Sequence, residues 1–356
     1  MTKNEIENRI YSFLCKQENH SLKQHMNYDY YNKFWENVSL LVDNGFLKSA
    51  KSVDKFCNKL QIKGFYNEDK YYQGISEILF WLYAIKSGYE FSADKKLNNE
   101  SNNPYENDVD VQIIQNNCKY NIEVKCPNQR EKPSDKTLTV NVPYRSIESL
   151  EKFDEEMYEI HNEVTQTIIK NSNGQYTNYQ QSKIVDNKVV EYLKSCQKKF
   201  NYDNDCINVL ALSVPSGELQ NYYGYLCNPA TGIFTDAFPG HFFDKDTNEV
   251  KYEHFDKVDV VYLTNIVTGH LKISDRINAW NLSEYCSILL INPYSRHTIE
   301  NTVVHLYKNL LSLLPNDTLK FKKERDEKLR NNILNEVPID PIIFFEYLYN
   351  YYPLLR

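Results

Sequence analysis

The chain has 356 residues, of which 41% are hydrophobic and 25% are charged, and its formal net charge is −7. This apolar content can bury a substantial core, which excludes an intrinsically disordered chain. The negative charge excludes a protein held on nucleic acid by its overall field, although an acidic metal site would itself add to that charge. No apolar run approaches the roughly 20 residues of a membrane span, and charges interrupt the N-terminal segment. We therefore expect a cytoplasmic protein without a membrane partner. Its many Tyr, Asn, Lys and Ile residues are typical of a low-GC bacterium.

The eight cysteines are scattered, without a CxxC pair and without a histidine at zinc-ligand spacing. We interpret them as reduced thiols. The sequence also lacks a GxxxxGK[ST] loop, so we expect no nucleotide cofactor.

In chain order, residues 1–70 have apolar residues at helical spacing and predict an N-terminal helical region. A further helix is expected over residues 74–86, with Gly74 or Ser76 capping its start. Glu77 lies within the apolar run of this helix, where an ionised carboxylate needs a partner.

Two alternating segments follow, at residues 108–114 and 119–125, and Asn116-Asn117 between them suits a two-residue hairpin turn. A largely helical stretch, interrupted near Asn173-Gly174, is expected over residues 146–200, and the apolar run 206–214 predicts a buried strand. Further strands are expected at 258–264 and 286–291. Helices are expected at 303–314, 320–330 and 341–351. We expect three regions: a helical region at 1–70, a catalytic core at 71–215, and a β-rich then helical region at 216–356 that binds substrate or a partner.

The predicted hairpin carries a polar cluster on one face. Side chains alternate along a strand, so Glu123 and Lys125 project to the same side. A two-residue turn at Asn116-Asn117 places Asp110 opposite Glu123 and Asp108 opposite Lys125. Opposed carboxylates repel each other unless a cation lies between them, and Mg²⁺ prefers such oxygen ligands. The alternative is that these side chains form the solvated face of an ordinary antiparallel hairpin.

Glu77 in a helix, then Asn107-Asp108-Val109-Asp110, then Ile122-Glu123-Val124-Lys125 resembles the Glu…(P)D…(D/E)xK pattern of the PD-(D/E)xK nuclease superfamily. The resemblance implies an α/β fold with a restriction-endonuclease-like core, in which a mixed sheet is flanked by helices in αβββαβ order. It also implies Mg²⁺-dependent hydrolysis, for which Mn²⁺ could substitute. Asp110 and Glu123 would be metal ligands, Glu77 a further carboxylate and Lys125 the residue that orients water. Asp108 remains an alternative ligand to Asp110.

Other residues near this pattern suggest substrate contacts. Arg130 and Lys132, in the loop after Lys125, could contact phosphates. Gln197, on the helix before the last core strand, could be a polar helper, with Gln180 and Gln181 as alternatives. We expect an endodeoxyribonuclease of bacterial restriction or anti-phage defence, with DNA as its partner and a homodimer or a second subunit for double-strand cleavage. The alternatives are a DNA-repair nuclease and a non-catalytic subunit of the same fold that binds nucleic acid or protein.

Overall fold

A computed structural model of the chain describes residues 1–97, 108–127, 137–141, 162–163, 165–175, 178–182, 185–227, 232–235, 242–244, 249–251, 255–273, 278–300, 304–320, 323 and 327. The chain forms two compact units. The first comprises Met1–Asn128, Cys196–Leu219 and Lys257–Lys323, and the second comprises Gln129–Ser195, Gln220–Asp256 and Glu324–Arg356. Among the described residues, no helix is long and apolar enough to cross a membrane.

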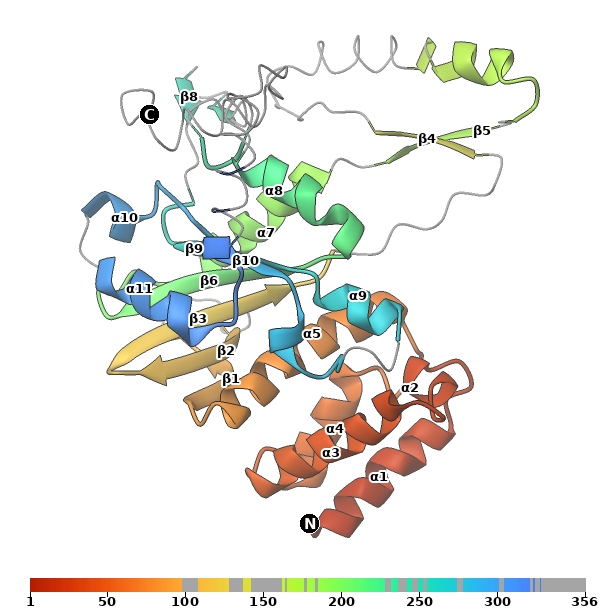
Figure 1. Cartoon of the computed structure of the whole chain (residues 1–356), viewed down its shortest axis with the longest axis vertical. Helices are drawn as coiled ribbons and strands as arrows, with labels where there is room; N and C mark the ends of the chain where they lie inside the picture. Colours follow the sequence, from red (N-terminus) through yellow and green to blue (C-terminus); the bar gives the residue numbers. More distant parts are fainter. Residues whose placement is uncertain are drawn as a thin grey trace. The chain divides into compact units, whose positions relative to one another are not determined.

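The predicted N-terminal helical region is confirmed, and its helices lie beside α5 in the first unit (Figure 1). Side chains cap three of the helix starts: the Thr2 and Ser49 hydroxyls accept backbone N–H groups in capping boxes, and Nδ1 of His20 accepts the N–H of Leu22. The apolar positions Ile6, Ile10 and Leu14 of the first helix are fully or almost fully buried, as their helical spacing predicts. The helices are α1 (Lys3–Cys15), α2 (Ser21–Gln24), α3 (Asp29–Asp43) and α4 (Ala50–Lys59).

Helix α5 (Glu68–Lys86) begins earlier than the sequence predicted, because Asn67 caps it by accepting the N–H of Lys70. Gly74 therefore does not cap the helix but lies inside it. A Cβ atom at Gly74 would lie 2.0 Å from the backbone oxygen of Lys59. The glycine thus allows the C-terminal end of α4 to pack directly against α5.

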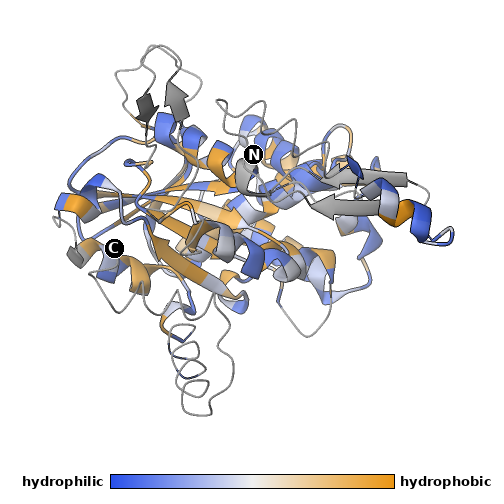
Figure 2. Cartoon of the chain, turned by 90° about the horizontal axis from the view of Figure 1, so that it is seen from above, coloured by the Kyte–Doolittle hydropathy of each residue, from blue (hydrophilic) through white to orange (hydrophobic). Residues whose placement is uncertain are grey.

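A mixed six-stranded sheet forms the centre of the first unit, in the order β1-β2-β3-β6-β9-β10. Strands β3, β6 and β9 run parallel to one another, and the outer neighbours on both sides are antiparallel. Every residue of β6 is buried, which explains its continuous apolar sequence. Figure 2 shows the central strands mostly in the hydrophobic colour. The strands are β1 (Glu90–Lys96), β2 (Asp108–Gln115), β3 (Cys118–Lys125), β6 (Cys206–Ser213), β9 (Val260–Thr264) and β10 (Ser287–Ile291).

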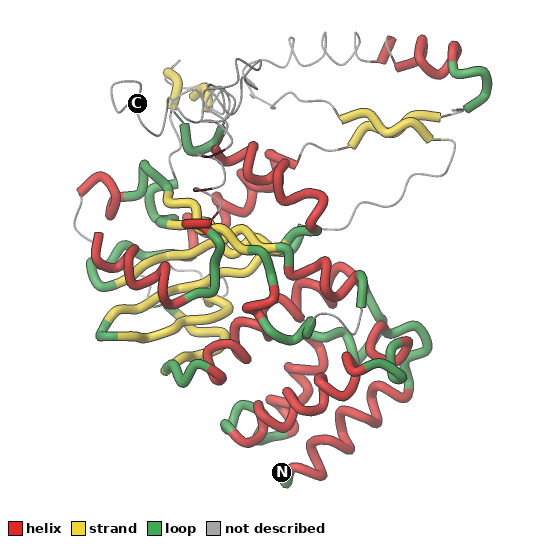
Figure 3. Tube along the Cα trace, viewed as in Figure 1, coloured by secondary structure: helices red, strands yellow, loops and turns green. Residues whose placement is uncertain are grey.

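The elements around this sheet confirm an α/β fold (Figure 3). Helix α5 is followed by β1, β2 and β3, and α7 (Val185–Lys199) directly precedes β6. The predicted strands at 258–264 and 286–291 are β9 and β10, which extend the sheet beyond β6. Further helices in the first unit are α9 (Ile266–Leu271), α10 (Arg296–Glu300) and α11 (Val304–Leu313). The helix expected at 341–351 and most of the one expected at 320–330 lie outside the described residues.

The β2–β3 hairpin has the predicted register. Asn116 and Asn117 both have positive φ angles, 52° and 63°, as a turn of type I′ requires. Gln115 pairs with Cys118, and the pairing continues to Val111 opposite Ile122. The next position outward from the turn therefore joins Asp110 and Glu123.

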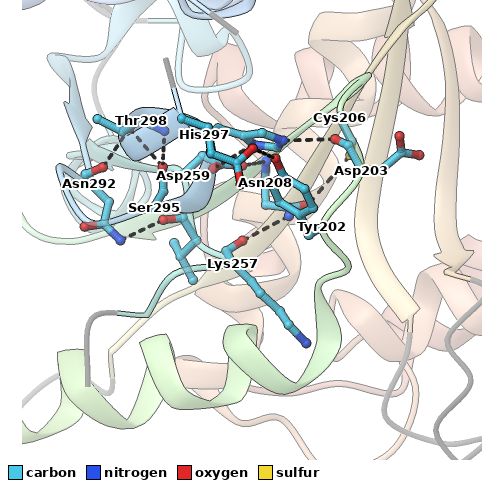
Figure 4. A network of polar contacts seen from close by, with 12 residues as sticks. Tyr202, Asp203, Cys206, Asn208, Lys257, Asp259, Asn292, Ser295, His297 and Thr298 are labelled. Atoms are coloured by element: carbon cyan, nitrogen blue, oxygen red, sulfur yellow. Dashed lines mark hydrogen bonds and ion pairs between the residues drawn. The ribbon is translucent and has the colours of Figure 1, made fainter. Parts of the chain in front are cut away.

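A buried polar network joins Asn208 of β6, Asp259 directly before β9 and His297 of α10 (Figure 4). Oδ2 of Asp259 accepts the N–H of Asn208 at 2.8 Å, and Oδ1 lies 3.0 Å from Nδ1 of His297. Asp259 and His297 are each 1% exposed. These contacts join three segments that are far apart in the sequence.

In the second unit, β4 (Thr137–Asn141) pairs in parallel with β5 (Asn178–Ser182), and β7 (Phe242–Asp244) pairs with β8 (Glu249–Lys251). Helix α8 (Leu219–Cys227) follows β6 in the chain. The prediction of helix over 146–200 is therefore wrong at β5. This segment is polar and lacks helical periodicity. Its strand partner lies about 40 residues earlier, so the pattern of neighbouring residues could not predict the pairing.

Candidate metal centre

Three adjacent antiparallel strands each contribute a carboxylate at corresponding positions. Ala93 pairs with Val111 and Lys95 with Val109, which places Asp94 of β1 opposite Asp110 of β2. The β2–β3 register in turn places Asp110 beside Glu123. The Oδ2 atom of Asp110 accepts the backbone N–H of Val124 at 2.8 Å, which adds a side-chain contact between β2 and β3. The result is a row of acidic residues across β1, β2 and β3.

Helix α5 adds a fourth carboxylate, Glu77, which is only 6% exposed. Gln73, one turn earlier, holds it in place. The Gln73 amide donates to Oε1 of Glu77 and to the backbone oxygen of Val124, both at 2.8 Å. Its own oxygen accepts the N–H of Cys126 at 2.7 Å. Gln73 thereby ties Glu77 to the end of β3.

Among the described residues, Glu77, Asp94 and Asp110 form a group that could hold a metal ion, with one ligand atom from each lying within 4.8 Å of the others. We call these three residues the acidic triad. Burial raises the pKa of Asp110 well above its usual value, and the charges of Glu77 and Glu123 raise it further. The nearby ammonium of Lys59 opposes this rise. The negative charge of the site is therefore costly without a cation.

Glu123 lies next to the acidic triad, between two lysines. Lys125 Nζ donates to its Oε1 at 2.7 Å, and Lys199 Nζ, from the end of α7, donates to the same oxygen at 2.5 Å. Burial is the largest single influence and would lower the pKa of Lys125, but the charge and hydrogen bond of Glu123, with smaller contributions from Cys196 and Asp110, together raise it. Lys125 is thus held as a cation beside the carboxylates.

Glu123 is only 1% exposed, so the alternative of a solvated hairpin face is wrong for this residue. Its Oε2 atom is buried and has no hydrogen-bond partner in the described part of the chain. A buried carboxylate oxygen without a donor is unfavourable. The oxygen-only donor set and this unpaired atom both fit a hard divalent cation such as Mg²⁺.

The structure thus brings together Glu77, Asp110, Glu123 and Lys125. Asp108 is outside the acidic triad, although its Oδ1 is also buried without a hydrogen-bond partner among the described residues. Gln197 accepts the N–H of Lys257 at 2.9 Å and so fixes the loop before β9. Arg130 and Lys132 lie outside the described residues.

Sequence reasoning missed four residues of this site: Lys59, Gln73, Asp94 and Lys199. Gln73 precedes Glu77 by one helical turn, which was a usable signal. Asp94 lies in β1, and no short turn fixes the register of β1 against β2. Lys59 and Lys199 reach the site only through packing and had no local signal.

Comparison of the chain with protein-family models, curated proteins and solved structures found no match. The resemblance to the PD-(D/E)xK superfamily therefore rests on the residues of this chain alone.

Proposed function

We propose that this protein is a Mg²⁺-dependent nuclease that hydrolyses DNA phosphodiester bonds. The observation that carries the proposal is the convergence of Glu77, Asp94, Asp110 and Glu123 beside the ammonium of Lys125. Carboxylates that hold a divalent cation, with a lysine next to them, suit a reaction in which negative charge develops on a phosphate. An acidic site without such a cation would repel the phosphates of nucleic acid.

The residues divide into two groups by role. Glu77, Asp94, Asp110 and the unpaired oxygen of Glu123 would hold Mg²⁺ or Mn²⁺. A bound cation supplies Lewis acidity and lowers the pKa of a coordinated water. Lys125 orients the attacking water and offsets charge on the phosphate, and Lys199 adds a second positive charge next to it.

The biological setting follows from the resemblance alone. We place the nuclease in bacterial restriction or anti-phage defence, in the cytoplasm. Arg130 and Lys132 would contact phosphates next to the site. Cleavage of both strands of a duplex would call for a homodimer or a partner subunit.

The test is cleavage of linear, supercoiled and single-stranded DNA, and of RNA, by the purified protein in Mg²⁺, Mn²⁺ or EDTA. We expect metal-dependent cutting of DNA that Lys125→Ala and Glu123→Ala each reduce by roughly 100-fold or more. Lys119→Ala is the matched control, because Lys119 lies on the same strand but its side chain is 46% exposed. A folded wild-type protein that cuts no substrate, or cutting that survives EDTA or both site variants, would refute the proposal.

A further inference from the structure

The ammonium of Lys59 occupies the acidic triad. Lys59 is the last residue of α4, and its side chain is 16% exposed. Its Nζ contacts Oε2 of Glu77 and lies 3.1 Å from Oδ1 of Asp94. A lysine from the N-terminal helical region thus contacts two of the three carboxylates and offsets one of their negative charges.

Three features hold Lys59 in this position. Its backbone oxygen packs against Gly74 of α5, where no side chain larger than hydrogen fits. Gly74 and Glu77 are three residues apart and so lie on the same face of α5. The Nζ atom also lies 5.5 Å from the centre of the Trp81 ring, in a cation–π contact. The placement of Lys59 is therefore built into the packing of α4 on α5.

The hydrogen bonds leave little room for a second cation on the same carboxylates. Gln73 and Lys59 take the two oxygens of Glu77. Lys59 and Lys55 take the two oxygens of Asp94, with Lys55 at 2.8 Å. A divalent ion on the acidic triad needs these oxygens, and an ammonium so close would repel it. Independently of the triad, Oε2 of Glu123 is buried without a hydrogen-bond donor among the described residues and could serve as a ligand to a cation.

We propose that Lys59 is an internal counter-ion that competes with the divalent cation for the acidic triad. Metal binding displaces its Nζ from Glu77 and Asp94, and the N-terminal helical region thereby sets the metal affinity of the site. This inference rests on the proposed function in one respect, namely that the acidic triad is where the metal binds.

The experiment is calorimetric titration of Mn²⁺ and Mg²⁺ into the full chain, as wild type, Lys59→Met, Lys55→Met and Lys59→Met/Asp110→Asn. Removal of the competing charge should tighten metal binding in Lys59→Met by roughly tenfold. Lys55→Met is the matched control, because Lys55 also contacts Asp94 but its side chain is 59% exposed. We expect it to change affinity by about twofold or less. The double variant should lose binding, which assigns the tightened site to the triad.

Thermal unfolding gives a second readout that does not depend on activity. Without metal, Lys59→Met should melt below wild type, since Glu77 and Asp94 lose the cation that they contact. Saturating Mn²⁺ should raise its melting temperature by more than that of wild type. If Lys59→Met does not fold without metal, Lys59→Gln keeps a hydrogen-bond donor without the charge and should show the same tightening.

Equal or weaker metal binding in Lys59→Met and Lys59→Gln would overturn the inference and make Lys59 a supporting residue of the site. The proposed function would survive that result. If neither wild type nor these variants binds either ion, both the inference and the proposed function fail. The two failures are therefore distinguishable.

Discussion

At the scale of single residues, Asp94 shows how backbone conformation and charge combine. Its φ of 48° is in the left-handed region, which asparagine and aspartate tolerate better than most residues. Substitution by asparagine therefore removes the charge without straining the backbone. Asp108, on the neighbouring strand, offers a matched comparison because it lies outside the acidic triad.

We expect Asp94→Asn to weaken Mn²⁺ binding by roughly tenfold, since ligand charge sets the affinity of an oxygen site. Asp108→Asn should change it by less than about threefold. Calorimetry on the two variants checks both values. An equal loss of affinity in Asp108→Asn would instead indicate that the cation binds between Asp108 and Glu123.

His20 is a second residue whose chemistry is set by burial. Its Nδ1 accepts the N–H of Leu22 at 3.1 Å, and its Nε2 lies 2.8 Å from the backbone oxygen of Leu60. The neutral ring satisfies both contacts, whereas protonation would remove the acceptor at Nδ1. Burial lowers the pKa of His20 to about 4.

This pKa lies below that of an unfolded histidine, so the unfolded chain takes up the proton first as the pH falls. The contribution of His20 to stability is complete above about pH 6.5 and is lost between pH 6.5 and about 4, by roughly 3 kcal/mol. Urea unfolding across this range checks the loss. His20→Asn, which can still cap α2, should show a shallower dependence on pH. Equal slopes in the two proteins would contradict the assignment.

At the scale of elements, the contact between α4 and α5 depends on one glycine. In Gly74→Ala, the new Cβ would meet the Lys59 oxygen at 2.0 Å, so the two helices must separate. We expect a cost of roughly 1–3 kcal/mol in unfolding free energy. Because Lys59 would move away from Glu77, metal binding should also tighten.

Gly224, inside α8, is the control, because a Cβ there meets nothing within 4 Å. Gly224→Ala should be neutral or stabilising by up to about 1 kcal/mol. Denaturant unfolding of both variants makes the comparison. A Gly74→Ala protein as stable as Gly224→Ala would show that α4 does not pack as closely as described.

At the scale of the whole molecule, Asp259 connects parts of the first unit that are far apart in the sequence. Removal of its carboxylate would leave the Asn208 N–H and the His297 ring buried without their acceptor. We expect Asp259→Ala to destabilise the protein by roughly 3–5 kcal/mol. Asp203→Ala, which removes a half-exposed carboxylate near Lys119, should cost less than about 1 kcal/mol. Thermal unfolding distinguishes these outcomes, and similar losses would argue against a central role for the network in Figure 4.

The sequence by itself determined the features that depend on neighbouring residues. Helical spacing predicted the N-terminal helices, and apolar runs predicted β6, β9 and β10. Asn116-Asn117 predicted the hairpin and its register, because a two-residue turn leaves no freedom in the pairing of the strands it joins. That register placed Asp110 beside Glu123. Helix α5, in turn, was expected to carry Glu77 within an apolar run.

Only the tertiary structure decided which other groups complete the site. The long connection between β1 and β2 does not set their register, so Asp94 could not be placed opposite Asp110. Lys59 and Lys199 are 18 and 76 residues from the carboxylates they contact, and helix packing alone brings them there. The hairpin register had already favoured Asp110 over Asp108, and the acidic triad likewise contains Asp110 and not Asp108. Neighbouring residues thus determined the strands and the turn, and long-range packing determined which charged side chains lie beside them.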